Sequence, residues 1–103
     1  MGLGLGLGFG LGGFNWGAYW ASLVSATVED AAPTKIVLTF GVADTSLIAA
    51  DFTIAGFTVT LLERDVTNKI LTLTVSVAVI TSDTLVVTFG KAVATAAVTN
   101  NVL

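Results

Sequence analysis

Between Lys69 and Val79 the chain reads KILTLTVSVAV, in which large aliphatic and small residues alternate strictly from Leu71 onward. The large positions are Leu71, Leu73, Val75 and Val77, and the positions between them hold Thr72, Thr74 and Ser76. Successive side chains of a β-strand point to opposite faces, so this period of two predicts a strand with one buried face. Because β-branched residues favour a half-buried pleated surface, the stretch predicts a β-protein.

Shorter stretches with the same period lie on both sides of this strand. Together with it, the expected strands are residues 22–29, 35–42, 51–55, 57–62, 69–79, 84–90 and 93–102. The side chains expected to point inward from the neighbouring strands include Ile36, Leu38, Phe40, Phe52, Ile54, Leu85, Val87 and Phe89. Residues 43–50 have room for one helical turn. Short strands separated by turn residues are typical of a β-sandwich, here of about seven strands.

The composition points to contacts with other subunits. The chain has 103 residues, enough for one domain. Hydrophobic residues make up 54% of it and charged residues 11%, about half the usual charged share of a soluble domain. The mean hydropathy is +0.93. A small domain buries a modest share of its surface, so we expect part of this apolar excess to be covered by other copies or other proteins.

The N-terminal segment differs from the rest, because residues 1–28 carry no side chain that is charged at neutral pH. Glycine alternates with large apolar residues from Gly2 to Gly12, and these residues are Leu3, Leu5, Leu7, Phe9 and Leu11. In an extended chain this pattern gives one apolar face and one bare face that another backbone can approach closely. We therefore expect an extended anchoring arm over residues 1–21 and a folded domain over residues 22–103.

The arm also holds a cluster of aromatic residues, Phe14, Trp16, Tyr19 and Trp20. Such rings can stack on sugars, but aromatic side chains also dominate interface energies. Their place in an uncharged segment favours subunit contact. The predicted partner-binding residues are therefore Leu3, Leu5, Leu7, Phe9, Leu11, Phe14, Trp16, Tyr19 and Trp20.

Three other interpretations of the arm fit less well. A transmembrane helix needs about 20 mostly apolar residues, which are present, but glycine alternates through them and no basic residue flanks them. A signal peptide fits the small residues Val24-Ser25-Ala26 as a cleavage site, but there is no positively charged start. Disorder is the third alternative for a glycine-rich segment, although the low charge and many aromatic residues argue against it.

Few residues offer site chemistry. The four basic residues, Lys35, Arg64, Lys69 and Lys91, are scattered, which argues against a nucleic-acid partner. The chain has no cysteine and no histidine, so no familiar catalytic triad can be built. We predict no enzyme, no catalytic residue, no cofactor and no metal site.

The acidic residues are expected mainly at strand ends and turns, where aspartate commonly accepts bonds from backbone N–H groups. They are Glu29, Asp30, Asp44, Asp51, Glu63, Asp65 and Asp83. A calcium site from Asp44, Asp51 and Asp83 is the alternative, without a recognised loop spacing to support it. Residues 63–65 are expected to form a solvated turn, with a salt bridge to a partner as the alternative.

Several stretches resemble bacterial Ig-like repeat domains, which occur in surface-layer, adhesin-like and phage virion proteins. They are TKIVLTF (residues 34–40), DFTI (51–54), ILTLTVSV (70–77), SDTLVVTF (82–89) and VTNNV (98–102). The resemblance implies an Ig-like β-sandwich with a structural or adhesive role. A Gly-Leu-rich start joined to such a domain is similar to small virion proteins of tailed bacteriophages.

This resemblance, a single repeat and the lack of a standard export signal favour a virion structural protein assembled in the bacterial cytoplasm. We expect it to be a capsid- or tail-associated decoration or fibre-base subunit. Its partners would be other copies of itself or other virion proteins, without a membrane. The alternative is an adhesin-like module that binds a host surface glycan or receptor.

Overall fold

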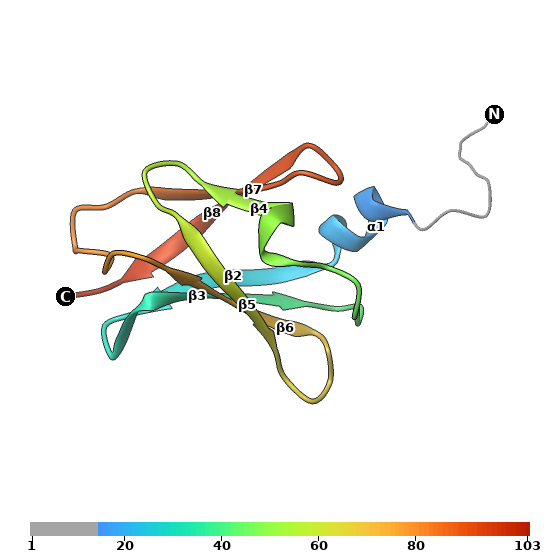
Figure 1. The fold of residues 1–103 in the computed structure, drawn as a ribbon, viewed down its shortest axis with the longest axis horizontal. Coiled ribbons are helices and arrows are strands. Elements are labelled where there is room, and N and C mark those ends of the chain that lie inside the picture. The colour runs from blue at the N-terminus through green and yellow to red at the C-terminus, as the bar shows by residue number, and fades with distance from the viewer. Residues whose placement is uncertain (1–14) are drawn as a thin grey trace.

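The computed structural model describes residues 15–103, which form an all-β domain with one short helix at its start (Figure 1). The elements are α1 (Trp16–Ala21), β2 (Leu23–Glu29), β3 (Ala32–Phe40), the 3-10 turn η1 (Ala49–Asp51), β4 (Phe52–Ile54), β5 (Val59–Arg64), β6 (Ile70–Val75), β7 (Leu85–Phe89) and β8 (Ala94–Asn101). The prediction of an all-β protein is therefore confirmed, and each expected strand overlaps one observed strand.

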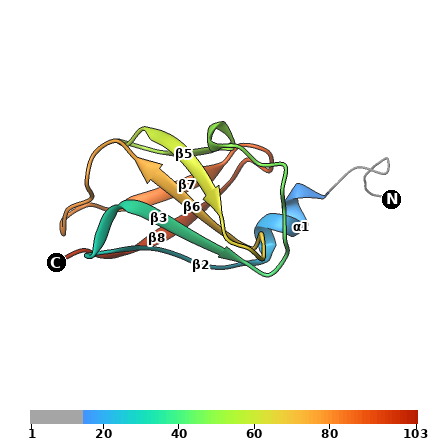
Figure 2. The same ribbon diagram turned by 60° about the horizontal axis from the view of Figure 1, so that its bottom comes forward.

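Within the described range, seven strands form one sheet in the order β4-β7-β8-β2-β3-β6-β5. Neighbouring strands are antiparallel except β2 and β8, which pair in parallel from Thr27–Thr99 to Glu29–Asn101. The sheet curls around the core until it is nearly closed (Figures 1 and 2). Its two ends, β4 and β5, are consecutive in the chain, and an isolated bridge pairs Ile54 of β4 with Phe57, two residues before β5 begins.

The core holds the side chains that the period of two places on the inner face. Buried positions that were predicted to point inward are Ile36, Leu38, Phe40, Phe52, Ile54, Leu71, Leu73, Val75, Leu85, Val87 and Phe89. Burial of a large aliphatic or aromatic side chain contributes about 1.5–3 kcal/mol, so this row supplies most of the drive to fold. The alternation therefore predicts the inner face of the sheet correctly.

The longest predicted strand ends early. β6 stops at Val75, and Val77, which was expected to face inward, is 63% exposed. Val79 is buried in its place, and its N–H donates to the carbonyl of Pro33 (2.8 Å). The chain leaves the ladder after Val75, so the alternation no longer tells which side chain meets the core.

The start of the domain also differs from the prediction. Residues 16–21 were expected to be extended, but they form the helix α1. Asn15 caps this helix, because its side-chain oxygen accepts a hydrogen bond from the Ala18 N–H (3.0 Å). The alternation with glycine ends at Gly12, so the period that favours an extended chain does not reach the helix. The predicted arm residues Leu3, Leu5, Leu7, Phe9, Leu11 and Phe14 lie outside the described residues.

Figure 1 shows that α1 and the C-terminal residue lie at opposite ends of the domain. The turns that follow β3, β5 and β7 lie at the same end as α1, since these strands all run towards it. We call this end the helix end. It contains the loop of residues 41–51, the β5–β6 turn of residues 65–69 and the β7–β8 turn of residues 90–93.

Candidate functional site

The helix end is organised by the aromatic residues of α1. Tyr19 is 1% exposed and its ring stacks on Phe40 of β3, with the ring centroids 4.4 Å apart. Trp20 stacks on Phe89 of β7 at 5.2 Å, and Trp16 meets the same ring edge-on at 5.7 Å. Aromatic pairs of this kind add about 0.5–1.5 kcal/mol to the energy of burial. The helix is therefore packed onto the core of the domain.

α1 also links two strands where they have stopped pairing. β2 and β8 pair only over their last residues, at the end of the domain far from α1. Nearer to α1, the Trp20 indole N–H donates to the carbonyl of Thr95 in β8 (3.4 Å). The helix is joined directly to the start of β2, where the Ser22 hydroxyl donates to the Tyr19 carbonyl (2.7 Å). α1 thus connects the first and last strands at the point where the chain enters the sheet.

These contacts divide the predicted partner-binding residues into three groups. Tyr19 is enclosed by the core of its own chain, so its role is to hold α1 in place. Trp16 and Trp20 are half-buried against Phe89 and keep part of their surface at the helix end. The remaining predicted residues precede Asn15. Residues 16–21, which were predicted to be part of the arm, therefore belong to the folded domain as α1.

The environment of Tyr19 changes its acidity. Burial raises the pKa of its hydroxyl to about 12, from a usual value of 10.0. The negative charge of Asp44 acts in the same direction, and the positive charge of Arg64 opposes it. The side chain is therefore neutral at physiological pH. A raised pKa of this origin reflects packing, since desolvation disfavours the charged form.

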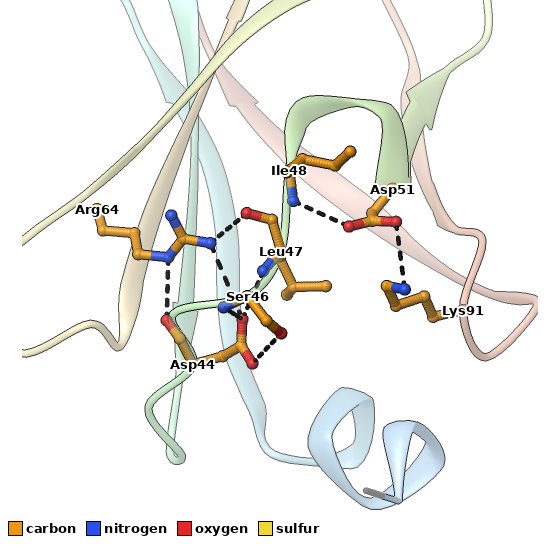
Figure 3. Close-up of polar contacts among 7 residues, drawn as sticks. All are labelled: Asp44, Ser46, Leu47, Ile48, Asp51, Arg64 and Lys91. Atoms are coloured by element: carbon orange, nitrogen blue, oxygen red, sulfur yellow. Dashed lines mark hydrogen bonds and ion pairs between the residues drawn. The ribbon is translucent and has the colours of Figure 1, made fainter.

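A second group of contacts at the helix end is polar and centres on Asp44 (Figure 3). Its carboxylate is buried and accepts bonds from the N–H groups of Ser46 (2.9 Å) and Leu47 (2.8 Å). Arg64, at the end of β5, lies 3.9 Å from this carboxylate and donates to the Asp44 carbonyl (3.0 Å). Its guanidinium also donates to the Leu47 carbonyl. Arg64 therefore fastens the loop to β5, and the expectation that it lies in a solvated turn is wrong.

The other two carboxylates of the calcium hypothesis have separate roles. Asp51 accepts from the Ile48 N–H (2.9 Å) and lies 3.8 Å from the Lys91 ammonium, as Figure 3 shows. Asp83 accepts from the Ile80 N–H (2.9 Å). Among residues 15–103, no three side chains of types that bind metal ions come together. The expected bonding of aspartates to backbone N–H groups is confirmed at these positions.

The two hairpin turns at the helix end use left-handed backbone in different ways. Asn68 in the β5–β6 turn has φ 58°, and Val93 in the β7–β8 turn has φ 49°. Asparagine adopts this conformation readily, whereas a β-branched residue does so at a cost of about 1–2 kcal/mol. Val93 is nevertheless 87% exposed, so burial does not compensate for the strain. Val93 is not among the predicted site residues, because no residue pattern predicts a valine in this conformation.

The β5–β6 turn is further stabilised by Asp65. Its carboxylate accepts bonds from the Thr67 hydroxyl (2.8 and 2.9 Å) and from the Ile70 N–H (3.2 Å). The bond from Thr67 is the main cause that lowers the pKa of Asp65. No comparable side-chain network is found among the described residues of the β7–β8 turn, where Lys91 instead lies over the ring of Trp16, 5.3 Å from its centroid.

The carboxylates of Asp44, Asp51, Asp65 and Asp83 thus bond to backbone N–H groups of their own loops and turns. In the part of the chain from Asn15 onward, no helix is long and apolar enough to cross a membrane. The resemblance to bacterial Ig-like repeats continues to depend on the short stretches quoted above. Comparisons of the chain with protein-family models, with characterised proteins and with solved structures found no match.

Proposed function

We propose that this chain is a structural assembly subunit whose N-terminal arm anchors it to neighbouring subunits. The observation that carries the proposal is the burial of Tyr19, since it fixes the base of the arm to the core. A segment used as an anchor transmits force to its domain only if the junction is firm. The aromatic packing of α1 against β3 and β7 supplies such a junction.

The residues of the arm support the same role. Each large apolar side chain buried in a neighbour contributes about 1.5–3 kcal/mol before the cost of ordering the glycines. The arm has five such residues between Gly2 and Gly12, and no charge that would need a partner. The resemblance to small phage virion proteins leads us to propose a capsid- or tail-associated position for the subunit.

We further propose that the domain is an Ig-like sandwich. The strand order supports this proposal: β2, β3, β6 and β5 follow one another in one part of the sheet, and β4, β7 and β8 in the other. With the strands lettered A to G in chain order, these are the ABED and CFG sheets of a constant-type immunoglobulin domain. An experimental structure with two layers packed at about 30° would support the proposal, and a closed barrel would overturn it.

We infer a structural role rather than an enzymatic one, from the absence of histidine and cysteine in the sequence and from the use of Asp44 and Asp51 as loop-bonding groups. Within residues 15–103, no observation favours the alternative of glycan binding. Tyr19 is buried against Phe40, and one face of the Trp20 ring stacks on Phe89, so both rings are used in packing within the domain.

The test uses the full chain with Leu5→Asp and Leu7→Asp combined. Analytical ultracentrifugation should show oligomers for the wild-type chain and monomers for the double variant. Circular dichroism of the two proteins should be the same, because the changed residues precede the folded domain. A wild-type chain that is monomeric at every concentration, or a double variant that still assembles, would contradict the anchoring function.

A further inference from the structure

We propose that the helix end is the surface that receives the arm of a second copy of this chain, with Val93 as a main contact. This inference rests on the proposed anchoring function and adds the identity of the surface to which the arm binds. It is carried by three observations: the strain at Val93, the other exposed aliphatic residues at this end, and the position of Asn15.

The first observation is the conformation of Val93. The residue combines left-handed backbone with 87% exposure, so it is unfavourable for the isolated domain on both counts. Residues held in strained backbone conformations cluster at functional sites, so an observed strained residue supports a hypothesis of function. An asparagine would fit this backbone, as Asn68 does in the β5–β6 turn, and its side-chain amide would be solvated better than a valine. We therefore attribute Val93 to a contact with a group outside the isolated domain. A valine side chain can make only an apolar contact of this kind.

The second observation is that Val93 is accompanied by other exposed aliphatic side chains on separate loops of the same end. They are Val42 (45% exposed), Ile48 (60%) and Val66 (99%). Two charged groups at this end already have partners: Lys91 contacts Asp51 and Trp16, and Arg64 contacts Asp44 and the loop carbonyls. Lys69 is exposed in the β5–β6 turn. An incoming uncharged segment that leaves Lys69 in solvent would thus meet apolar side chains without burying an unpaired charge.

The third observation concerns the length of chain that precedes the domain and where it begins. Fourteen residues precede Asn15, which caps α1 and therefore lies at the helix end. Gly2 to Gly12 in extended form would span about 36 Å at the usual rise per residue. Its row of leucines matches the aliphatic side chains in chemistry, and its glycine face lets it lie close to a surface.

The donor and the receiving surface therefore belong to the same end of one molecule. Such a surface is complementary to itself, so two copies can face each other about a two-fold axis and exchange arms. Each arm would then contact the turns of the partner. The large apolar residues of the arms and the exposed aliphatic residues of the helix ends would be buried in a single interface. Pairing through the opposite end would leave the arms uncovered.

The experiment compares Val93→Asn with Val77→Asn in the full chain. Val77 is the matched control, since it is also an exposed valine (63%) in a loop but lies at the opposite end. Sedimentation equilibrium should show that Val93→Asn weakens self-association about tenfold or more, while Val77→Asn leaves it unchanged. A cysteine pair at Leu7 and Val93 in the full chain should also form a disulfide between two chains rather than within one.

The outcomes separate this inference from the proposed function. If Leu5→Asp with Leu7→Asp disperses the oligomer but Val93→Asn does not, the arm is an anchor and the helix end is not its receiving surface. A disulfide formed within one chain would also overturn the inference, because the arm would then cover its own domain. If the leucine double variant assembles normally, the anchoring function itself fails.

Discussion

Two hairpins turn at the helix end of the domain, and they are built by different means. The β5–β6 turn has asparagine in its left-handed position and an aspartate that bonds Thr67 and Ile70. The β7–β8 turn has valine in its left-handed position, and the contacts of the neighbouring residues Phe89 and Lys91 are made with α1. One turn is stabilised by its own sequence and the other depends on the helix beside it.

The difference shows which part of the molecule is optimised for the isolated domain. The β5–β6 turn satisfies the usual rules of turn chemistry, so its residues need no further explanation. The β7–β8 turn breaks them at Val93, and departures from local preference tend to mark functional or strained sites. We make four predictions from this difference. Two concern Tyr19 in the helix beside the β7–β8 turn, and two concern the left-handed residue of each turn.

The largest effect is expected when the aromatic support of the β7–β8 side is removed. Tyr19→Ala should lower the free energy of unfolding by about 3–5 kcal/mol, since a buried ring is lost and a cavity remains. Chemical denaturation of the full chain measures this value. By the same reasoning, a chain shortened to begin at Ser22 should be strongly destabilised, whereas one that begins at Asn15 should keep its stability. A loss below about 1 kcal/mol for Tyr19→Ala would show that α1 is not part of the core.

The second effect is a loss of stability at alkaline pH. The pKa of Tyr19 is raised to about 12 in the folded chain, so between pH 10 and 12 the unfolded chain loses this proton first. The contribution of Tyr19 to the free energy of unfolding should thus be fully present below pH 10. The free energy of unfolding should fall by about 2–3 kcal/mol as the pH rises through this window. Tyr19→Phe keeps the ring and removes the titration, and the chain has no other tyrosine. Equal alkaline sensitivity in both proteins would contradict the prediction.

These first two predictions concern residues whose position the sequence did not reveal. The period of two located the strands and their inner face, because alternation follows directly from strand geometry. It could not show that residues 16–21 leave the arm to form a helix, since six residues are too few for a helical pattern to emerge. The burial of Tyr19 depends on Phe40 and Phe89, which are distant in the chain and approach it only after the sheet has formed.

The candidate site was predictable in part for the same reason. The N-terminal aromatic cluster drew attention to Trp16, Tyr19 and Trp20, all of which lie at the helix end. The role of Arg64 was missed because its partners, Asp44 and Leu47, come from a loop that no local pattern places beside β5. Val93 was missed because backbone conformation is set by the hairpin as a whole.

The third prediction concerns the β5–β6 turn, whose left-handed position is occupied by asparagine. Asn68→Val places a β-branched residue in left-handed backbone and should reduce stability by about 1–2 kcal/mol. Thermal unfolding should show a fall in melting temperature of about 4–8 °C for each kcal/mol in a domain of this size. Val66→Asn in the same turn is the control, since Val66 is 99% exposed and should change stability by less than about 0.5 kcal/mol. Equal effects from both variants would mean that the conformation of Asn68 carries no energetic weight.

The smallest effect is expected when the strain in the β7–β8 turn is relieved. Val93→Asn should raise the free energy of unfolding by about 0.5–1 kcal/mol, since asparagine accepts the left-handed backbone that valine resists. The measurement belongs at a protein concentration too low for self-association, because association would add its own contribution to the apparent stability. Val77→Asn, at a position without left-handed backbone, should give no gain.

A gain in stability at Val93 combined with a loss of self-association would show that the residue favours the assembly at the expense of the isolated domain. If the variant is neither more stable nor poorer in association, Val93 is not under strain. The difference between the two hairpins would then have no functional meaning. The strongest observation in favour of the helix end as the surface that binds the arm would be removed.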